Sequence, residues 1–245
     1  MKAHHPASPS TPRAAPQGRE KAFTDDDREP DINADFTRPV GLATTAMAWQ
    51  PSPAAGVWRK RLELIAGDPP RLTTIVRFEA GSAFDEHGHP RGEEFLVLRG
   101  TFSDASGDFP AGSYVRNPPG WRHAPYTETG CELFVKLCQF HEDDTARVVV
   151  DGRNAPPRET ASAALTRRPL HDHGSESVAL YDLAPGARAV PFDCPQGAEL
   201  LVLEGGLEVD TAHHPEGSWL RYPAGTRLHL GSSDGCRFYG KTGLF

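Results

Sequence analysis

The hydrophobic residues of this chain lie in short runs that are rich in β-branched and aromatic side chains. Glycine and proline separate the runs, a pattern typical of strands joined by turns. No amphipathic helical period stands out. The sequence therefore predicts an all-β fold, with antiparallel strands arranged in jelly-roll β-barrels. The runs are LTTIVRF (72–78), EFLVL (94–98), YVR (114–116), LFVKL (133–137), RVVV (147–150), SVALYDL (177–183), ELLVL (199–203), SWLRY (218–222), TRLHL (226–230) and CRFYG (236–240).

The chain matches itself without a gap when it is shifted by 105 residues, so that residues 94–100 fall on residues 199–205. About 18 of roughly 57 positions from 80 to 136 are identical to their partners, against about three expected by chance. We therefore predict a duplicated domain, with copies at 31–152 and 153–245. Residues 1–30 are rich in proline, alanine and charge, which predicts a disordered tail.

Composition excludes several classes of protein. The chain has 33 acidic and 26 basic residues and a net charge of −7, whereas a nucleic-acid surface normally carries a basic excess. No apolar run approaches the length of a membrane span, and the first 30 residues lack the apolar centre of a secretory signal. The four cysteines form no CxxC pair, which favours free thiols. We expect a cytoplasmic protein that binds neither nucleic acid nor membrane.

Three histidines and one glutamate are the candidate metal ligands: His87, His89, Glu93 and His123. His87 and His89 are two residues apart, a spacing that places both on one face of a strand. Proline and glycine form turns shortly before Glu93 and before His123. An HxH pair alone is weak support, because two histidines near a turn are usually solvated. The full set predicts one divalent ion, with Zn²⁺ or Fe²⁺ favoured over Mn²⁺ or Ni²⁺.

The complete string resembles the two-part motif of the cupin superfamily. Its first part is Gly81, His87, His89, Glu93 and Gly100, and its second part is Gly112, Pro118, Gly120 and His123. Further segments resemble, over about residues 31–150, the cupin domain of the ChrR anti-sigma-factor family, and the second half resembles it more faintly. These segments are INADF (32–36), WQPSPAAGV (49–57), GEEFLVL (92–98), RNPPG (116–120), GC (130–131) and FVKL (134–137).

The resemblance implies a bicupin, with zinc held by His87, His89, Glu93 and His123. Similar cupins that cleave acetylacetone hold Fe²⁺ through histidines. ChrR-type factors capture their sigma factor with an N-terminal helical domain that has its own His/Cys zinc site. This chain has no cysteine before Cys131 and no room for that domain, so a sigma factor is not an expected partner. Cupins often pair through their barrel faces, and the resemblance therefore implies a homodimer.

The second copy lacks the ligand set. A shift of 105 residues carries the four ligand positions onto Phe192, Cys194, Ala198 and Leu228. Only Cys194 could donate to a metal, and one donor does not make a site. His229 is next to a lost position, but a slip of one residue on a strand points it to the opposite face. We expect the second copy to be metal-free and structural.

Two classes of function remain open from the sequence. The first is a metal-dependent dioxygenase that cleaves a small oxygenated substrate, diketone-like or acid-like. The second is a non-catalytic zinc cupin that senses oxidative stress or a ligand. One carboxylate against three neutral imidazoles leaves a divalent centre positive, which favours an anionic small molecule. No catalytic residue is assigned beyond the ligands, and Glu94 alternates away from Glu93, toward solvent or the other side of the barrel wall.

Overall fold

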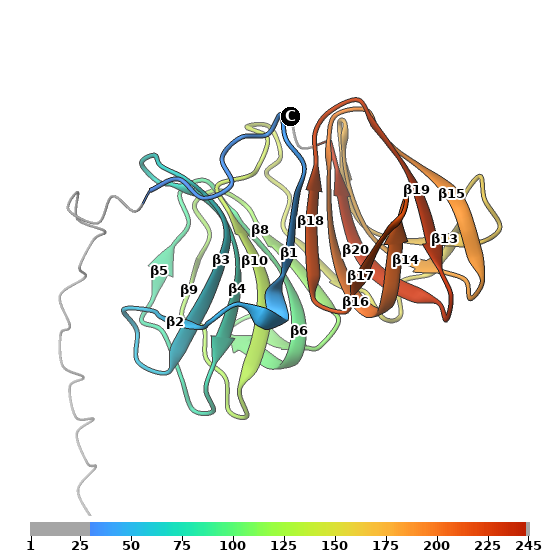
Figure 1. Cartoon of the computed structure of the whole chain (residues 1–245). Coiled ribbons are helices and arrows are strands. Elements are labelled where there is room, and N and C mark those ends of the chain that lie inside the picture. The colour runs from blue at the N-terminus through green and yellow to red at the C-terminus, as the bar shows by residue number, and fades with distance from the viewer. Residues whose placement is uncertain (1–29, 244–245) are drawn as a thin grey trace, which may run out of the picture.

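The computed structural model describes residues 30–243, so the predicted tail lies, apart from Pro30, outside the described residues. Two barrel-like halves lie side by side (Figure 1). Within the described range the chain forms strands and one three-residue 3-10 helix, η1 (Thr44–Ala46), which confirms the all-β prediction. No helix in this range is long and apolar enough to cross a bilayer.

The strands of the two halves repeat at the interval seen in the sequence. The first half contains β1 (Val40–Ala43), β2 (Gln50–Pro51), β3 (Val57–Ile65), β4 (Arg71–Phe78), β5 (His87–Gly88), β6 (Glu93–Asp104), β7 (Gly107–Pro110), β8 (Ser113–Asn117), β9 (Arg122–His123) and β10 (Cys131–Leu137). After β11 (Val148–Asp151), the second half contains β12 (Arg158–Glu159), β13 (Leu165–His173), β14 (Glu176–Leu183), β15 (Ala187–Cys194), β16 (Ala198–Val209), β17 (Ala212–Pro215), β18 (Ser218–Tyr222), β19 (Thr226–Ser232) and β20 (Cys236–Thr242). Strands β4, β6, β7, β8 and β10 coincide, residue for residue, with β14, β16, β17, β18 and β20 after a shift of 105 residues.

Each half is organised around one large antiparallel sheet. In the first half the order is β11-β8-β6-β10-β4-β3-β2, and in the second it is β1-β18-β16-β20-β14-β13-β12. Smaller pairings close each half: β5 with β9 in the first, and β15 with β19 in the second. All ten apolar runs of the sequence lie in strands or overlap them, because β-branched and aromatic residues fit a pleated, half-buried surface.

The two halves exchange an edge strand. Strand β1 precedes the first barrel in the chain, yet it pairs with β18 of the second, with Val40 opposite Arg221. Strand β11 leads toward the second half, yet it pairs with β8 of the first, with Val148 opposite Arg116. In Figure 1 the blue strand β1 lies against the orange-red strand β18. Each sheet is therefore completed by chain that leads into or out of the other half.

Successive side chains on a strand point to opposite faces of the sheet, and this divides the buried apolar residues into three hydrophobic cores. In β6, Phe95 and Val97 point into the first barrel, whereas Leu96 points out toward the second half. The equivalent strand β16 points Leu200 into the second barrel and Leu201 out toward the first. The middle core is thus shared by both halves. Its buried members are Leu62, Ile75, Leu96, Tyr114, Phe134, Leu170, Val178, Leu180, Leu201, Trp219 and Tyr239.

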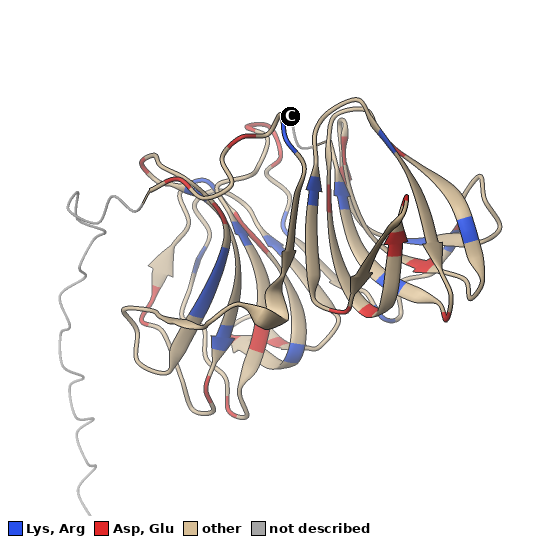
Figure 2. Cartoon of the chain, viewed as in Figure 1, with Lys and Arg blue, Asp and Glu red and all other residues tan. Residues whose placement is uncertain are grey.

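Charged side chains are buried beside this shared core in reciprocal pairs. Lys241 of the second half donates to Glu94 of the first at 2.6 Å, and Lys136 of the first half donates to Glu199 of the second. All four residues are almost fully buried. Figure 2 shows basic and acidic positions on the strands at this junction. Glu94 therefore lies on the outer side of the barrel wall, as one of the two predicted alternatives, and not in solvent.

Arg116 is the most heavily paired of the buried cations. Its guanidinium lies between three carboxylates, donating to Glu94 and, at 2.6 Å, to Asp144, with Glu176 at 2.9 Å. One face of the guanidinium covers the ring of Phe140 at 3.8 Å. Burial opposes ionisation of Glu94, but the neighbouring cations outweigh it and hold the pKa of Glu94 below its ordinary value. The junction is therefore fixed by charge pairing as well as by apolar packing.

Two glycines with a left-handed backbone but different surroundings allow a test of the fold. Gly100 has a φ of +71°, and a Cβ there would lie 2.0 Å from the carbonyl oxygen of Gly130; Gly225 has a φ of +79° with nothing within 4 Å. We expect Gly225→Ala to cost about 1–2 kcal/mol, from the left-handed backbone alone. Gly100→Ala should cost about 2–4 kcal/mol, because the backbone must also shift. Urea unfolding of both variants checks the difference, and equal losses would contradict it.

Candidate metal centre

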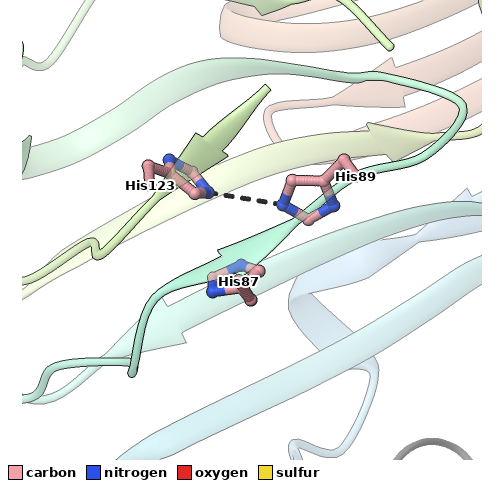
Figure 3. Close-up of side chains that lie close together, drawn as sticks. All are labelled: His87, His89 and His123. Carbon is pink, nitrogen blue, oxygen red and sulfur yellow. Dashed lines mark hydrogen bonds between the residues drawn. The ribbon is translucent and has the colours of Figure 1, made fainter. Parts of the chain in front are cut away.

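The strand pairing of the first barrel brings the predicted ligands together. His87 in β5 lies opposite His123 in β9, although the two are far apart in the sequence. His89 follows β5 directly, and Glu93 begins β6 after the turn at residues 90–92. Figure 3 shows the three imidazoles turned toward one another from these separate segments. Ring centroids are 4.9 Å apart for His87 and each of the other two, and 5.3 Å apart for His89 and His123.

The donor atoms converge on a common point. One ring nitrogen from each of the three histidines lies within 4.8 Å of the others. The Nε2 atoms of His89 and His123 are 3.3 Å apart. Glu93 spans this pair, with Oε1 3.6 Å from His89 Nε2 and Oε2 3.6 Å from His123 Nε2. The structure therefore brings all four predicted residues into one site.

Two of the candidate ligands, His87 and Glu93, are oriented by hydrogen bonds to neighbouring groups. His87 Nδ1 lies 2.9 Å from the carbonyl oxygen of Asp85, which leaves Nε2 of His87 as the free nitrogen. Asn117 is fully buried and donates from Nδ2 to Oε2 of Glu93 at 3.2 Å. Its own Oδ1 accepts from Arg147 at 3.4 Å, so the amide cannot turn over without losing a bond. Such outer partners fix the orientation of metal ligands.

The geometry fits a divalent ion. Metal–nitrogen bonds are about 2.1 Å long, so two nitrogens on one ion lie about 3.0–3.4 Å apart in octahedral or tetrahedral geometry. The 3.3 Å between the Nε2 atoms of His89 and His123 falls in this range. Without an ion, two imidazole nitrogens and a carboxylate would satisfy one another only by sharing protons. The donor set of three imidazoles and one carboxylate suits zinc or a redox-active first-row metal.

One side of the site is open and the other is sealed. The side chain of His89 is 15% exposed, whereas that of His123 is 3% exposed. The partly buried ring of Phe84 lies 5.6 Å from the His87 ring, and the buried ring of Phe102 lies 6.3 Å from the His123 ring. A ligand would therefore reach the site from the side of the partly exposed His87 and His89, and not from the side of the buried His123.

The equivalent positions of the second barrel are packed into its core. Phe192, Cys194, Ala198 and Leu228 are all buried among apolar neighbours. Burial raises the pKa of the Cys194 thiol to about 12, so the thiol is protonated at neutral pH and is a poor ligand. The side chain of His229 is half-exposed and lies 3.3 Å from Asp210, on the outer face of its strand. These contacts are consistent with the prediction of a structural second barrel.

A second group of potential ligands is occupied by an arginine. Asp144, His171 and Glu176 lie close enough to share an ion. However, the Arg116 guanidinium contacts Asp144 and Glu176, and His171 Nε2 lies 2.8 Å from the same Asp144 oxygen. The cation that these carboxylates require is thus already supplied by the protein. This group is part of the junction between the halves.

Sequence reasoning missed two residues of the site, Asp104 and Asn117. Asp104 ends strand β6, and its Oδ2 lies 3.4 Å from Nδ1 of His123. No motif in the neighbouring sequence identifies Asp104, because this residue lies near His123 only in the folded barrel. Asn117 did carry a signal: it directly precedes the Pro-Pro-Gly turn that places His123, and its register opposite Glu93 follows from pairing β6 with β8.

Comparisons with known proteins agree with this architecture. The sequence profile described as the ChrR Cupin-like domain matches residues 37–141 and, again, residues 145–245. No curated protein matches the chain. Among solved structures, a Nostoc punctiforme protein provisionally described as a dioxygenase superposes with a TM-score of 0.72 at 15% identity, covering 84% of this chain and 82% of that one.

Two further structures show the same fold. A Pseudomonas aeruginosa protein provisionally described as glyoxylate-induced has a TM-score of 0.67 at 15% identity, over 87% of this chain and 92% of that one. A point mutant of Bacillus subtilis oxalate decarboxylase has a TM-score of 0.58 at 12% identity, over 82% and 76%. Together with the duplicated profile, these matches confirm two tandem cupin domains. The chain belongs to the ChrR cupin-like family.

Proposed function

We propose that the first barrel binds one divalent metal ion through His87, His89, Glu93 and His123, and that this centre cleaves a small oxygenated substrate with O₂. The observation that carries the proposal is the convergence of three histidine nitrogens, with the Glu93 carboxylate 3.6 Å from two of them, at a site where His89 is partly exposed. Four protein donors leave two positions free on a six-coordinate ion. When bound, Fe²⁺ or Mn²⁺ supplies Lewis-acid and oxygen chemistry at those positions.

The residues around the donors have separate roles in this proposal. Asn117 holds the Glu93 carboxylate in place by its 3.2 Å hydrogen bond. The buried ring of Phe102 lies beside His123 and keeps water from the inner side of the site. The half-buried His87 and His89 line the entrance, which limits access to a small molecule. Solved relatives of the fold include proteins described as a dioxygenase and an oxalate decarboxylase, which supports a small, oxygen-rich substrate class.

Metal analysis and oxygen uptake test the enzyme proposal. Protein purified without added metal should contain about one iron or manganese ion per chain, and β-diketones or small organic acids should elicit O₂ consumption. His123→Ala should abolish the uptake, while His229→Ala, which removes a half-exposed histidine of the second barrel, should leave it unchanged. Stoichiometric zinc with no uptake from any candidate substrate would reject the enzyme proposal.

The family match favours a second candidate, a zinc-holding sensor. The profile that matches both halves is named for the cupin domain of ChrR. In this case the same four donors would close around Zn²⁺, and the response would be a change in the barrel when an oxidant or ligand reaches the centre. Zinc that is retained through purification, and released by peroxide without O₂ uptake, would support this candidate over the enzyme.

A further inference from the structure

His123 has a buried nitrogen without a hydrogen bond of good geometry. Its Nε2 faces His89 and Glu93, but its Nδ1 lies inside the protein and makes no such bond. The nearest acceptor is Oδ2 of Asp104, at 3.4 Å, and both side chains are only 3% exposed. A neutral imidazole carries one N–H, and a buried N–H without an acceptor costs about 1–3 kcal/mol. Asp104 is the acceptor that this nitrogen can reach.

Asp104 is itself held in position by the hairpin that follows it. Its other oxygen, Oδ1, accepts from the backbone N–H of Ser106 at 2.7 Å and from the Ser106 hydroxyl at 2.5 Å. The Ser106 hydroxyl in turn accepts from Arg147 at 2.6 Å. With Oδ1 fixed by the turn, Oδ2 is directed at the back of His123. The carboxylate is therefore placed before any metal arrives.

We propose that Asp104 is a positioning residue of the metal centre: it accepts the Nδ1 proton of His123 and so presents Nε2 of His123, unprotonated, to the ion. The proposal rests on metal binding by the first barrel but not on which reaction follows. A carboxylate behind a ligating histidine fixes its tautomer and raises its basicity, and losing such a partner typically weakens metal binding about 10- to 100-fold.

Asp104 also changes the charge of the centre. Glu93 and Asp104 together bring two negative charges to three neutral imidazoles, which balances a divalent ion. The sequence, which showed only Glu93, favoured an anionic ligand on the ground that the centre would be positive. With Asp104 included, the net positive charge that favoured an anionic ligand is offset, so anions should bind less tightly than they would at a centre with Glu93 alone.

The hairpin offers a matched pair of variants. Asp104→Asn removes the charge behind His123, and Asp108→Asn removes the same charge from the same hairpin, where the exposed Asp108 carboxylate accepts from the Ser103 hydroxyl at 2.7 Å. With Zn²⁺ in competition with a chelator, Asp104→Asn should weaken binding about 10- to 100-fold, and Asp108→Asn should change it less than twofold. In the Co²⁺-loaded protein, azide should bind more tightly to Asp104→Asn than to the wild type. Equal effects of the two variants, or no effect of Asp104→Asn, would overturn the proposal.

A measurement on the metal-free wild type needs no variant to fold. Long-range ¹H–¹⁵N correlation spectra at slightly alkaline pH should show His123 protonated on Nδ1 and His89 protonated on Nε2, since the two Nε2 atoms are 3.3 Å apart and only one can donate. A His123 protonated on Nε2 would overturn the role of Asp104. Failure of the wild type to bind Zn²⁺ or Co²⁺ would instead reject the metal centre, so the two failures are distinguishable.

Discussion

His123→Ala is expected to abolish the stabilisation of the protein by divalent metal. An ion present at about a thousand times its dissociation constant stabilises the folded state by about 4 kcal/mol, because it binds only that state. His123 supplies the most buried of the three imidazoles, and its Nε2 lies within 3.6 Å of two other donors. Removing it leaves His87, His89 and Glu93 around a gap where the inner donor was.

Thermal unfolding with and without Zn²⁺ measures this effect. The wild type should show a clear rise in melting temperature on addition of the metal, and His123→Ala should show almost none. His229→Ala makes the same chemical change at a half-exposed position of the second barrel and should keep the full rise. A metal-induced rise that survives in His123→Ala, or that disappears in His229→Ala, would contradict the assignment of the site to the first barrel.

Arg116→Met is expected to destabilise the chain by about 3–5 kcal/mol without touching the metal ligands. The substitution leaves the Glu94, Asp144 and Glu176 carboxylates buried and without their shared cation. A buried charge that loses its partner retains its full desolvation cost, so the loss exceeds what the ion pairs contributed when intact. Methionine fills much of the same volume, which keeps the effect electrostatic and not one of packing.

A control on the surface separates burial from charge. Arg227 pairs with Asp193 at 2.6 Å, but the two side chains are 70% and 60% exposed. Arg227→Gln should therefore cost less than about 1 kcal/mol. Urea unfolding followed by circular dichroism compares the two variants. If Arg116→Met were as stable as Arg227→Gln, the charge pairing at the junction of the halves would contribute little to the fold.

The sequence predicted the strands that are short, continuous runs of apolar, β-forming residues between turns. Strands β6 and β16 were predicted from EFLVL and ELLVL, and the ligands followed from their spacing, because both depend on local composition and turn chemistry. Strand β3, VWRKRLELI, was missed since its buried positions include Lys60 and Glu63, whose burial depends on partners elsewhere in the chain. Burial of Glu94 could not be predicted for the same reason: its cations come from β8 and β20.

The local sequence pattern also does not determine where one copy ends and the other begins. The copies were predicted to meet at residues 152 and 153, after the apolar run that became β11, and this boundary stays a prediction. The family profile begins its second match at residue 145, so β11 falls in that match, yet it pairs with β8 of the first barrel. A repeat found by sequence comparison need not coincide with a unit of hydrogen bonding.

The crossed placement of β1 and β11 makes the two copies inseparable as folding units. Cutting the chain between them would strip one sheet of the strand beside Ser218–Tyr222, and would leave backbone donors and acceptors there open to pairing with other molecules. A protein that consists of one copy alone should therefore expose an unpaired strand edge and aggregate. A substitution that destabilises the second copy should therefore also destabilise the first, which carries the candidate metal ligands, so selection would act to retain both copies.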